Sequence, residues 1–312
     1  MENRLVSSLK TLLPFVGITI FVYILLRIGL TNIWASIKLA NFFYLFLALL
    51  FLIPIYLLTG FKWNYLIKKQ GLKVSNLFLM KAILMGEFYG VITPGKLGTL
   101  TRIKYLSEKV GKSLSICAPS VVIDRVMDFL GVLIVSLFGV LTLYRYFSQY
   151  AILISISLII FIILFIVMFN KKVNLIVNFI VPFSKNMGFL KFIDNFYSNL
   201  PKFKTMIIAV ILAIIYWLVI YIQEYFVLLA VHVSLPFGFF IVSQAIATII
   251  LLIPITINGL GTRDVTLISM FSLFNIPASA TLAYSILSML MLAFIPWIFG
   301  LMILLKRRVK KQ

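Results

Sequence analysis

The chain has 312 residues, of which 63% are hydrophobic and 12% are charged, and 28 Lys and Arg face only 8 Asp and Glu. A soluble domain is about half apolar and about a quarter charged, so this composition excludes an ordinary soluble fold. The net charge of +20 does not indicate a nucleic-acid partner, because the basic residues interrupt long apolar runs. One Cys and one His leave no internal disulfide and no Cys/His zinc site. The sequence predicts an all-α polytopic membrane protein with no metal or other cofactor.

Six apolar runs are long enough to cross the membrane as helices. A hydrocarbon core of about 30 Å requires roughly 20 helical residues. The runs that meet this length are 12–30, 39–61, 118–144, 150–169, 206–231 and 281–305. The first run shows no cleavage site of small residues, which favours a retained span over a signal peptide. Trp34, Trp63 and Trp297 lie near span ends and are interpreted as interfacial anchors.

Two further apolar segments, 76–95 and 237–257, end at clusters of Pro, Gly and Asn and continue as shorter, more polar pieces. We interpret both as broken or re-entrant helical segments. Two ordinary hairpins of short helices fit the sequence equally well. Either alternative leaves the number of full crossings unchanged.

Lysine and arginine collect in four connecting stretches, which set the orientation by the positive-inside rule. These stretches are 62–81, 96–112, 170–205 and 306–311. Placing all four in the cytoplasm, Lys62 included, predicts a multi-pass protein of the cell membrane with cytoplasmic N- and C-termini. Within 170–205, Ile and Val recur at helical spacing between Lys and Asn. This pattern predicts an amphipathic helix on the inner leaflet and not a solvated linker.

An internal repeat relates the two halves of the chain. ITPGKLGT at 92–99 and ITINGLGT at 255–262 agree at five of eight positions, 163 residues apart, and an arginine follows each. We interpret 1–312 as a single integral membrane domain with inverted half-repeats, roughly 1–145 and 150–312. A chance match between membrane sequences of low complexity is the alternative. Inverted repeats with broken helices mark the substrate site of many transporters.

The residues at the two breaks suit a substrate site. Non-helical backbone is tolerated at membrane depth only where protein buries it or where it lines a wet cavity. The helix that begins after each break is expected to offer free N–H groups and a positive dipole end to an anion. Structural kinks are the alternative interpretation. The break residues assigned to the site are Thr93, Pro94, Gly95, Gly98, Asn258, Gly259 and Gly261.

Five of the eight acidic residues lie within or beside apolar segments. A charge at the centre of a membrane helix costs roughly 2.5–3.5 kcal/mol, so each requires a partner or a wet cavity. Asp124 and Asp128 share one helix face and, with Arg125, form either a structural ion-pair network or substrate contacts. The other acidic residues assigned to the site are Glu87, Glu224 and Asp264. A proton carried with the substrate on Glu87 or Glu224 is a further hypothesis.

Three motifs carry a resemblance to a known family: TPGKLGTLTR at 93–102, DRVMD at 124–128 and NGLGTRD at 258–264. In them the chain resembles the lysylphosphatidylglycerol synthase transmembrane-region family. Its members are flippase-like membrane domains, found alone or fused to the synthase domain of multiple peptide resistance factor proteins. With the number and length of the spans, the likeness covers nearly the whole chain. In the first motif, Lys96 stands where the family usually has Arg, and Thr99 stands where it usually has Glu. Asp264 stands where Glu is common. A mechanism that requires an acid at position 99 therefore does not transfer to this chain.

The resemblance implies translocation or handling of a phosphate-bearing lipid, such as an aminoacyl-phospholipid, a glycolipid or a polyprenyl-phosphate. The chain ends just after the last span, so we expect a stand-alone form that does not synthesise the lipid. We expect the headgroup in a polar cavity between the two breaks, held by Arg102, Arg263 and Arg125. No nucleotide-binding loop is present in the sequence.

Two other functions stay open. One is an integral membrane transferase that modifies lipid headgroups, with Asp124 or Asp128 as a general base or metal ligand. The other is a scaffold for a lipid-modifying enzyme. The expected partners are therefore membrane lipids with anionic or phosphate-bearing headgroups, a second copy of the chain, or such an enzyme.

Overall fold

The computed structural model describes residues 16–142, 187–253 and 256–309, and four helical positions between 156 and 163. The predicted span 150–169 and the part of the predicted connection before residue 187 therefore lie essentially outside the described residues. The chain divides into two compact units. Unit 1 contains the described parts of Met1–Leu57, Ile83–Thr101 and Leu218–Gln312, and unit 2 those of Leu58–Ala82 and Arg102–Trp217.

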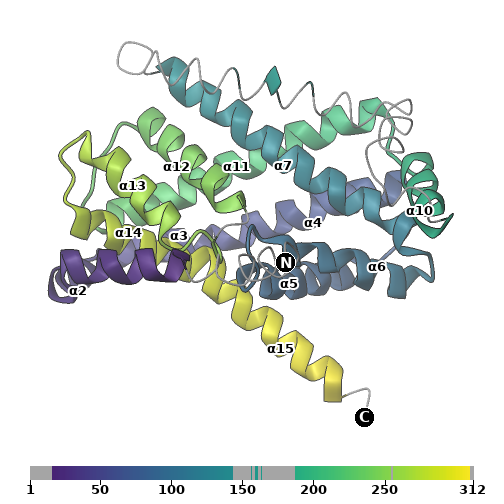
Figure 1. The fold of residues 1–312 in the computed structure, drawn as a ribbon, viewed down its shortest axis with the longest axis horizontal. Coiled ribbons are helices and arrows are strands. Elements are labelled where there is room, and N and C mark those ends of the chain that lie inside the picture. The colour runs from purple at the N-terminus through teal and green to yellow at the C-terminus, as the bar shows by residue number, and fades with distance from the viewer. Residues whose placement is uncertain are drawn as a thin grey trace, which may run out of the picture. The chain divides into compact units, whose positions relative to one another are not determined.

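Every regular element in the described part of the chain is helical, as the sequence predicts (Figure 1). In chain order the elements are the helix Val16–Ile28, α2 (Leu30–Lys38), α3 (Phe42–Leu50), α4 (Leu52–Lys69), α5 (Asn76–Val91), the 3₁₀ helix η1 (Leu97–Thr101), α6 (Arg102–Val110), α7 (Leu114–Thr142), α10 (Met187–Ser198), α11 (Phe203–Ala230), α12 (Phe237–Leu252), α13 (Thr262–Ser272), α14 (Ala278–Met289), the π-helix η3 (Leu290–Phe294) and α15 (Ile295–Val309).

Three helices in the described residues are long and apolar enough to cross a membrane: Phe42–Lys69, Phe203–Ala230 and Ala278–Arg307. At 28 to 30 residues they measure about 42–45 Å, which exceeds a hydrocarbon core of about 30 Å. They confirm the predicted spans 39–61, 206–231 and 281–305. The 29-residue α7 covers most of the predicted span 118–144 but is not one of these three helices.

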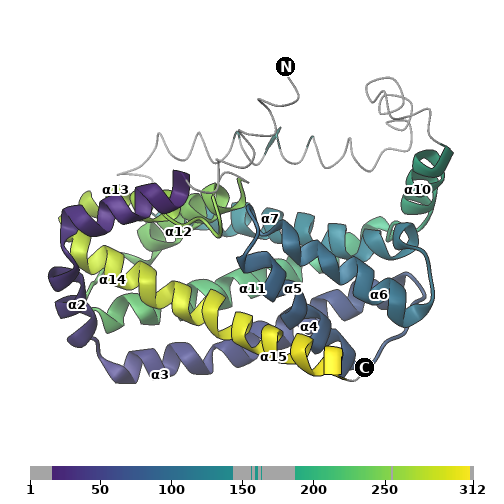
Figure 2. The ribbon, with the colours of Figure 1, turned by 60° about the horizontal axis from the view of Figure 1, so that its bottom comes forward.

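The chain bends at the end of the predicted first span, 12–30, of which residues 16–30 are described. Helix Val16–Ile28 and α2 meet at an angle of 81°, and the bend is visible in Figure 2. Gly29, between them, has φ 86°, a left-handed conformation that only glycine adopts at little cost. α2 packs on α14, where Ile24, Ile33 and Leu282 form a buried cluster. Counted as one span, the bent pair raises the number of described crossings to four, against six predicted.

The second span continues beyond residue 61, where the apolar run in the sequence ends. α4 reaches Lys69, so Lys62 and Trp63 lie inside the helix, with 1% and 0% of their surfaces exposed. The prediction of Trp63 as an interfacial anchor is therefore wrong, and Lys62 is a buried residue of the helix and not part of an exposed basic stretch. Both residues are in the core of unit 2, and only the exposed Lys68 and Lys69 end the helix.

Unit 2 is packed around α7. A buried cluster joins α7 to α4 and to the first half of α11 through Leu66, Ile123, Met127, Leu130, Met206, Ala209 and Ala213. Gly131 of α7 approaches α11 so closely that an added Cβ would lie 3.0 Å from the Ala213 carbonyl. α6 lies along α7 (Figure 1), and α10 also packs against α7.

In unit 1, the second broken segment forms a pair of helices. The 16-residue α12 packs against α13, and α13 packs against α14. Figure 2 shows α14 and α15 following one another as one long helix, with the π-helical turn of η3 between them. The side chains that α11, α13 and α14 direct into unit 1 form the polar part of the candidate site.

Candidate functional site

The two helix breaks meet in unit 1. Pro94 and Ile257 form an antiparallel β-bridge. They occupy equivalent positions in the motifs 92–99 and 255–262, 163 residues apart. The two segments that the sequence relates are thus adjacent in the fold, although Ile255, in the second motif, lies outside the described residues.

Equivalent residues of the two breaks share their backbone geometry. The two central residues of each turn have positive φ: Gly95 (58°) and Lys96 (55°) in the first, Asn258 (50°) and Gly259 (71°) in the second. In each turn the leucine that follows, Leu97 or Leu260, donates its N–H to the carbonyl three residues earlier, at 3.3 Å and 3.0 Å. Positive φ at both central positions is typical of a type I′ turn. Each break is therefore the same tight turn.

A threonine hydroxyl closes each turn in the same way. Thr99 donates to the Lys96 carbonyl at 2.9 Å, and the equivalent Thr262 donates to the Gly259 carbonyl at 3.3 Å. The Thr99 hydroxyl therefore stabilises the first turn. In the second break, the hydroxyl groups of Thr256 and Thr262 are also hydrogen-bonded to one another, with 3.0 Å between the two oxygens.

Glycines allow close approach at equivalent points of the two breaks. A Cβ on Gly98 would lie 2.1 Å from the Tyr89 carbonyl oxygen, and one on Gly261 would lie 2.3 Å from the carbonyl oxygen of Gly17. Thr93 bridges the first approach, because its hydroxyl donates to the Tyr89 carbonyl at 2.8 Å and accepts the Gly98 N–H at 2.7 Å. No other residue type fits at either position without moving the backbone.

The N–H groups that follow the breaks are bonded within the chain. The Gly98 N–H donates to the Thr93 hydroxyl, and the Gly261 N–H donates to the Asp264 carboxylate at 2.9 Å. For these groups the expectation of free N–H donors aimed at an anion is wrong. The positive end of α13 and the guanidinium of Arg263 remain to attract an anion at the second break.

A buried polar cluster adjoins the second break, and we call it the Glu224 cluster. Its members come from α11, α13 and α14, and they are Glu224, Arg263, Asp264, Tyr284, Ser285 and Ser288. Arg263 donates to Ser288 Oγ at 2.8 Å and lies 3.5 Å from Glu224 Oε2. Ser288 donates to Glu224 Oε1 at 2.6 Å, and the Tyr284 hydroxyl donates to Oε2.

Asp264 has a different set of donors. It is the third residue of α13, where it accepts the Gly261 N–H, and the Ser285 hydroxyl donates to its other oxygen. A carboxylate in the first turn of a helix is stabilised by the helix dipole as well. Asp264 therefore caps α13 and fixes the turn that precedes it.

The second polar cluster lies in unit 2, and we call it the Lys62 cluster. It joins α4, α6 and α7 through Lys62, Arg102, Asp124, Arg125 and Asp128. Lys62 Nζ lies 3.2 Å from Asp124 Oδ1 and also bonds Asp128. Arg102 Nη2 donates to Asp124 Oδ2 at 3.0 Å. Asp124 and Asp128 thus share one helix face and both have basic partners, as the sequence predicts.

Aromatic rings surround the cations of this cluster. The Arg102 guanidinium lies 4.9 Å from the centre of the Trp63 ring, and Lys62 Nζ lies 4.8 Å from that of Tyr216. The Trp63 indole N–H donates to Ser120 Oγ at 3.4 Å. Cation–π contacts gain strength when they are desolvated, as these are. The cluster therefore holds α4, α6, α7 and α11 together in unit 2.

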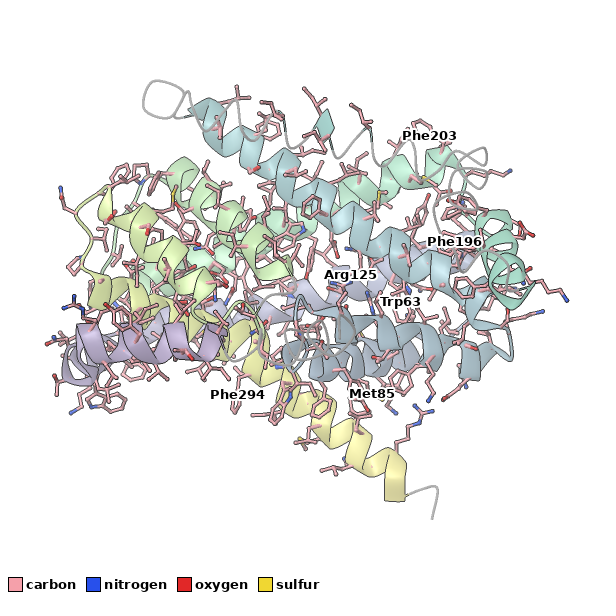
Figure 3. All side chains as sticks on the ribbon, in the orientation of Figure 1. Trp63, Met85, Arg125, Phe196, Phe203 and Phe294 are labelled. Carbon is pink, nitrogen blue, oxygen red and sulfur yellow. The ribbon has the colours of Figure 1, made fainter. Side chains whose placement is uncertain are left out.

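Arg102 is engaged in this network and is 1% exposed. Arg125, which is labelled in Figure 3 together with Trp63, differs from Arg102. Its side chain is 32% exposed, and its Nη1 lies 3.8 Å from Asp128 Oδ2. Three cations face two carboxylates, which leaves one positive charge in excess. Among the members of the Lys62 cluster, Arg125 has the most exposed side chain.

The remaining assigned residue, Glu87, is half-buried on α5, and no hydrogen bond or ion pair joins it to another residue in the described part of the chain. The described residues also contain no group of three or more His, Cys, Asp and Glu that could hold a metal ion. Nothing in that part of the chain favours Asp124 or Asp128 as a metal ligand.

The structure thus sorts the assigned residues into two sets. The breaks, Arg263, Glu224 and Asp264 come together in unit 1, while Arg102, Asp124, Arg125 and Asp128 come together in unit 2. Four residues of the two clusters were not predicted as site residues: Lys62, Tyr284, Ser285 and Ser288. For the last three, hydroxyl groups spaced along one face of an otherwise apolar helix were the available signal. For Lys62 the available signal was its position directly after the apolar run 39–61, where a helix can continue.

Comparison with known proteins agrees with the resemblance in the motifs. A family model described as the lysylphosphatidylglycerol synthase TM region matches residues 14–300. The UPF0104 membrane protein MJ1595 of Methanocaldococcus jannaschii is 29% identical, over 100% of this chain and 99% of the relative. The UPF0104 membrane protein MJ1078 of the same organism is 27% identical, over 72% of this chain and 97% of the relative.

Proposed function

Because the chain belongs to the lysylphosphatidylglycerol synthase transmembrane-region family, we propose that this membrane protein translocates lipids with a phosphate-bearing headgroup. The observation that carries the proposal is the pairing of the two helix breaks at Pro94 and Ile257. Transporters place their substrate where broken helices of two repeats meet. The family and the paired breaks therefore point to the same activity.

Two tight turns side by side bring much polar backbone into one place in an apolar protein. Such backbone is tolerated at membrane depth only inside protein or beside a wet cavity. The buried Thr256 and Asn258 add side-chain polarity, with 0% and 8% of their surfaces exposed. A polar headgroup can exchange hydrogen bonds with these groups, while the acyl or prenyl tails stay in the bilayer.

Arg263 supplies the positive charge of the proposed site. It follows the second break directly and lies in the first turn of α13, where its charge adds to the positive end of the helix. A guanidinium can grip a phosphate through two parallel N–H groups, which an ammonium group cannot do. In this proposal Thr93, Pro94, Gly95, Gly98, Asn258, Gly259 and Gly261 shape the breaks, and Asp264 fixes the second one.

The Lys62 cluster has a second task in the proposal. Arg102, Asp124 and Asp128 hold the helices of unit 2, and the partly exposed guanidinium of Arg125 is proposed as a phosphate contact of that unit taken by itself. Glu87, half-buried on α5, is proposed to border the path of the headgroup. The cargo is an aminoacyl-phospholipid, a phosphate-bearing glycolipid or a polyprenyl-phosphate.

The shared turn geometry also supports an origin by duplication. We take the half-repeats to be inverted in the membrane, with 76–95 and 237–257 entering from opposite faces. Both termini are then cytoplasmic, in the cell membrane. Equivalent residues of the two breaks agree in backbone φ and in turn hydrogen bonds, and they are paired in the β-bridge. This partial match supports the arrangement.

Reconstituted vesicles test the function. They carry purified protein and a fluorescent phosphatidylglycerol, and a membrane-impermeant reductant bleaches the label exposed outside. Empty vesicles should protect the inner-leaflet label, whereas vesicles with protein should lose it at a rate that grows with protein content. A labelled galactosyl-diacylglycerol, which lacks phosphate, is the control lipid and should remain protected. Protection of both lipids, or loss of both at equal rates, would contradict translocation selective for phosphate-bearing headgroups.

A further inference from the structure

The contacts of Glu224 are unusual in kind, because hydroxyl groups provide most of them. Ser288 donates to Oε1 and Tyr284 to Oε2, while Arg263 approaches Oε2 at 3.5 Å. A hydroxyl both donates and accepts hydrogen bonds. If Glu224 binds a proton, Ser288 can turn to accept that proton, and Tyr284 can continue to donate to the other oxygen. The surroundings of Glu224 therefore satisfy its charged and its neutral form.

Asp264 provides the contrast within the same cluster. One of its donors is the Gly261 backbone N–H, which cannot accept a hydrogen bond, and the positive end of α13 favours its negative charge. Asp264 thus serves as the cap of α13. Of the two carboxylates in the cluster, Glu224 is the one that contacts Arg263 and lies away from a helix N-terminus.

The link between Arg263 and Glu224 is the loosest contact of the cluster. The distance is 3.5 Å, whereas Arg263 donates to Ser288 at 2.8 Å. The Arg263 side chain is 12% exposed and that of Glu224 is 6% exposed. Arg263 can therefore exchange its anionic partner while it keeps its bond to Ser288.

The other titratable groups around Glu224 limit what a bound anion would do. Arg263 and Asp264 face it from α13, Tyr284 from α14, and Tyr221 from its own helix one turn earlier. With both carboxylates charged, Arg263 is the one cation of this group. A phosphate entering without compensation would place a further negative charge in a buried site, which is strongly unfavourable.

We propose that Glu224 occupies the anion position of Arg263 in the lipid-free protein, and that a phosphate headgroup displaces it while Glu224 takes up one proton from solution. The proton forms an O–H bond on the Glu224 carboxyl group, and no other covalent bond forms or breaks. One negative charge leaves Arg263 as another arrives, so the charge of the site is unchanged. The inference rests on the proposed function, because the lipid must reach Arg263.

Calorimetric titration of the full-length protein in detergent counts the protons. The probe is a short-chain phosphatidylglycerol, titrated in two buffers that differ in their enthalpy of ionisation. The wild type should take up about one proton per lipid bound, and its affinity should fall by up to about tenfold for each unit rise in pH. Glu224→Gln should bind the lipid without proton uptake and with an affinity independent of pH. Glu108→Gln, which changes an exposed acid on α6, should behave as the wild type.

The outcomes separate this inference from the proposed function. Lipid binding without proton uptake in the wild type, or equal uptake in Glu224→Gln, would overturn the proton exchange and leave translocation standing. A parallel titration uses glycerophosphoglycerol, the phosphodiester headgroup without tails. Proton-linked binding of glycerophosphoglycerol alone would support the exchange at Arg263 and contradict the lipid as cargo. Binding of neither probe would overturn both.

Discussion

Lys62 of α4 and Asp124 of α7 lie 3.2 Å apart, and both side chains are almost fully buried. The pair cannot be judged alone, because Lys62 also bonds Asp128 and Asp124 also accepts from Arg102. Each charge in this network has an opposite charge as its neighbour. Lys62 is the cation that both carboxylates share, and its removal leaves the buried Asp124 with Arg102 and Asp128 with the more distant Arg125.

Lys62→Met should destabilise the protein strongly. The variant keeps the length of the side chain but leaves Asp124 and Asp128 without their shared cation, and breaking a buried ion pair costs about 3–5 kcal/mol. The melting temperature in detergent should fall accordingly. A thiol-reactive dye can report unfolding, because Cys117 is the one cysteine and is buried.

Two variants control this measurement. Lys62→Met combined with Asp128→Asn removes one charge of each sign and should recover much of the lost stability. Lys81→Met removes an exposed lysine and should change the melting temperature little. Equal melting temperatures for Lys62→Met and Lys81→Met would show that Lys62 is not part of a buried network.

Gly98→Ala should disturb the first break, because the added Cβ would lie 2.1 Å from the Tyr89 carbonyl oxygen. Relief requires a backbone shift, and overpacking of this kind costs about 1–3 kcal/mol or more. Translocation and the melting temperature should both fall. Gly71→Ala is the matched control, since Gly71 has φ 75° but no atom within 4 Å of an added Cβ.

Gly71→Ala should cost about 1–2 kcal/mol through its left-handed backbone alone and should leave translocation intact. The comparison thus separates local backbone strain from damage to the break. Full translocation by Gly98→Ala would count against the close approach of Gly98 to Tyr89.

Cysteines at the bridged positions should form a disulfide. Opposite residues in an antiparallel pair have Cα atoms about 4.5–5.5 Å apart, within the range that a disulfide spans. The variant Pro94→Cys/Ile257→Cys, made with Cys117→Ser so that no other thiol is present, should yield one cross-linked peptide after mild oxidation and proteolysis. Mass spectrometry detects it. A persistent pair of free thiols would place the two breaks apart.

The class of fold and the pairing of the breaks could be predicted from the sequence, because both depend on local patterns. Apolar runs set the spans, and Pro94 and Gly259 mark turns wherever they occur in a helix. Equivalent motifs 163 residues apart then suggest equivalent places in the fold. The antiparallel bridge between Pro94 and Ile257 agrees with that suggestion.

What the sequence did not predict depends on tertiary contacts. Lys62 follows an apolar run, where a lysine usually marks the membrane surface, but the carboxylates of α7 bind it in the core of unit 2. Tyr284 and Ser288 become site residues because Glu224 of another helix faces them. The bend at Gly29 was missed because a single glycine within an apolar run is also compatible with a straight helix.

The most direct test of the central claim is the rate at which the double variant Arg263→Gln/Glu224→Gln translocates fluorescent phosphatidylglycerol in reconstituted vesicles. Glu224→Gln preserves side-chain size, Arg263→Gln shortens its side chain, and together they remove one charge of each sign, so the melting temperature should stay close to that of the wild type. The site would then lack its cation while the fold is intact, and we predict that translocation falls to the rate of empty vesicles. A stable double variant that translocates the lipid at the wild-type rate would contradict the assignment of Arg263 and the paired breaks as the site of lipid transport.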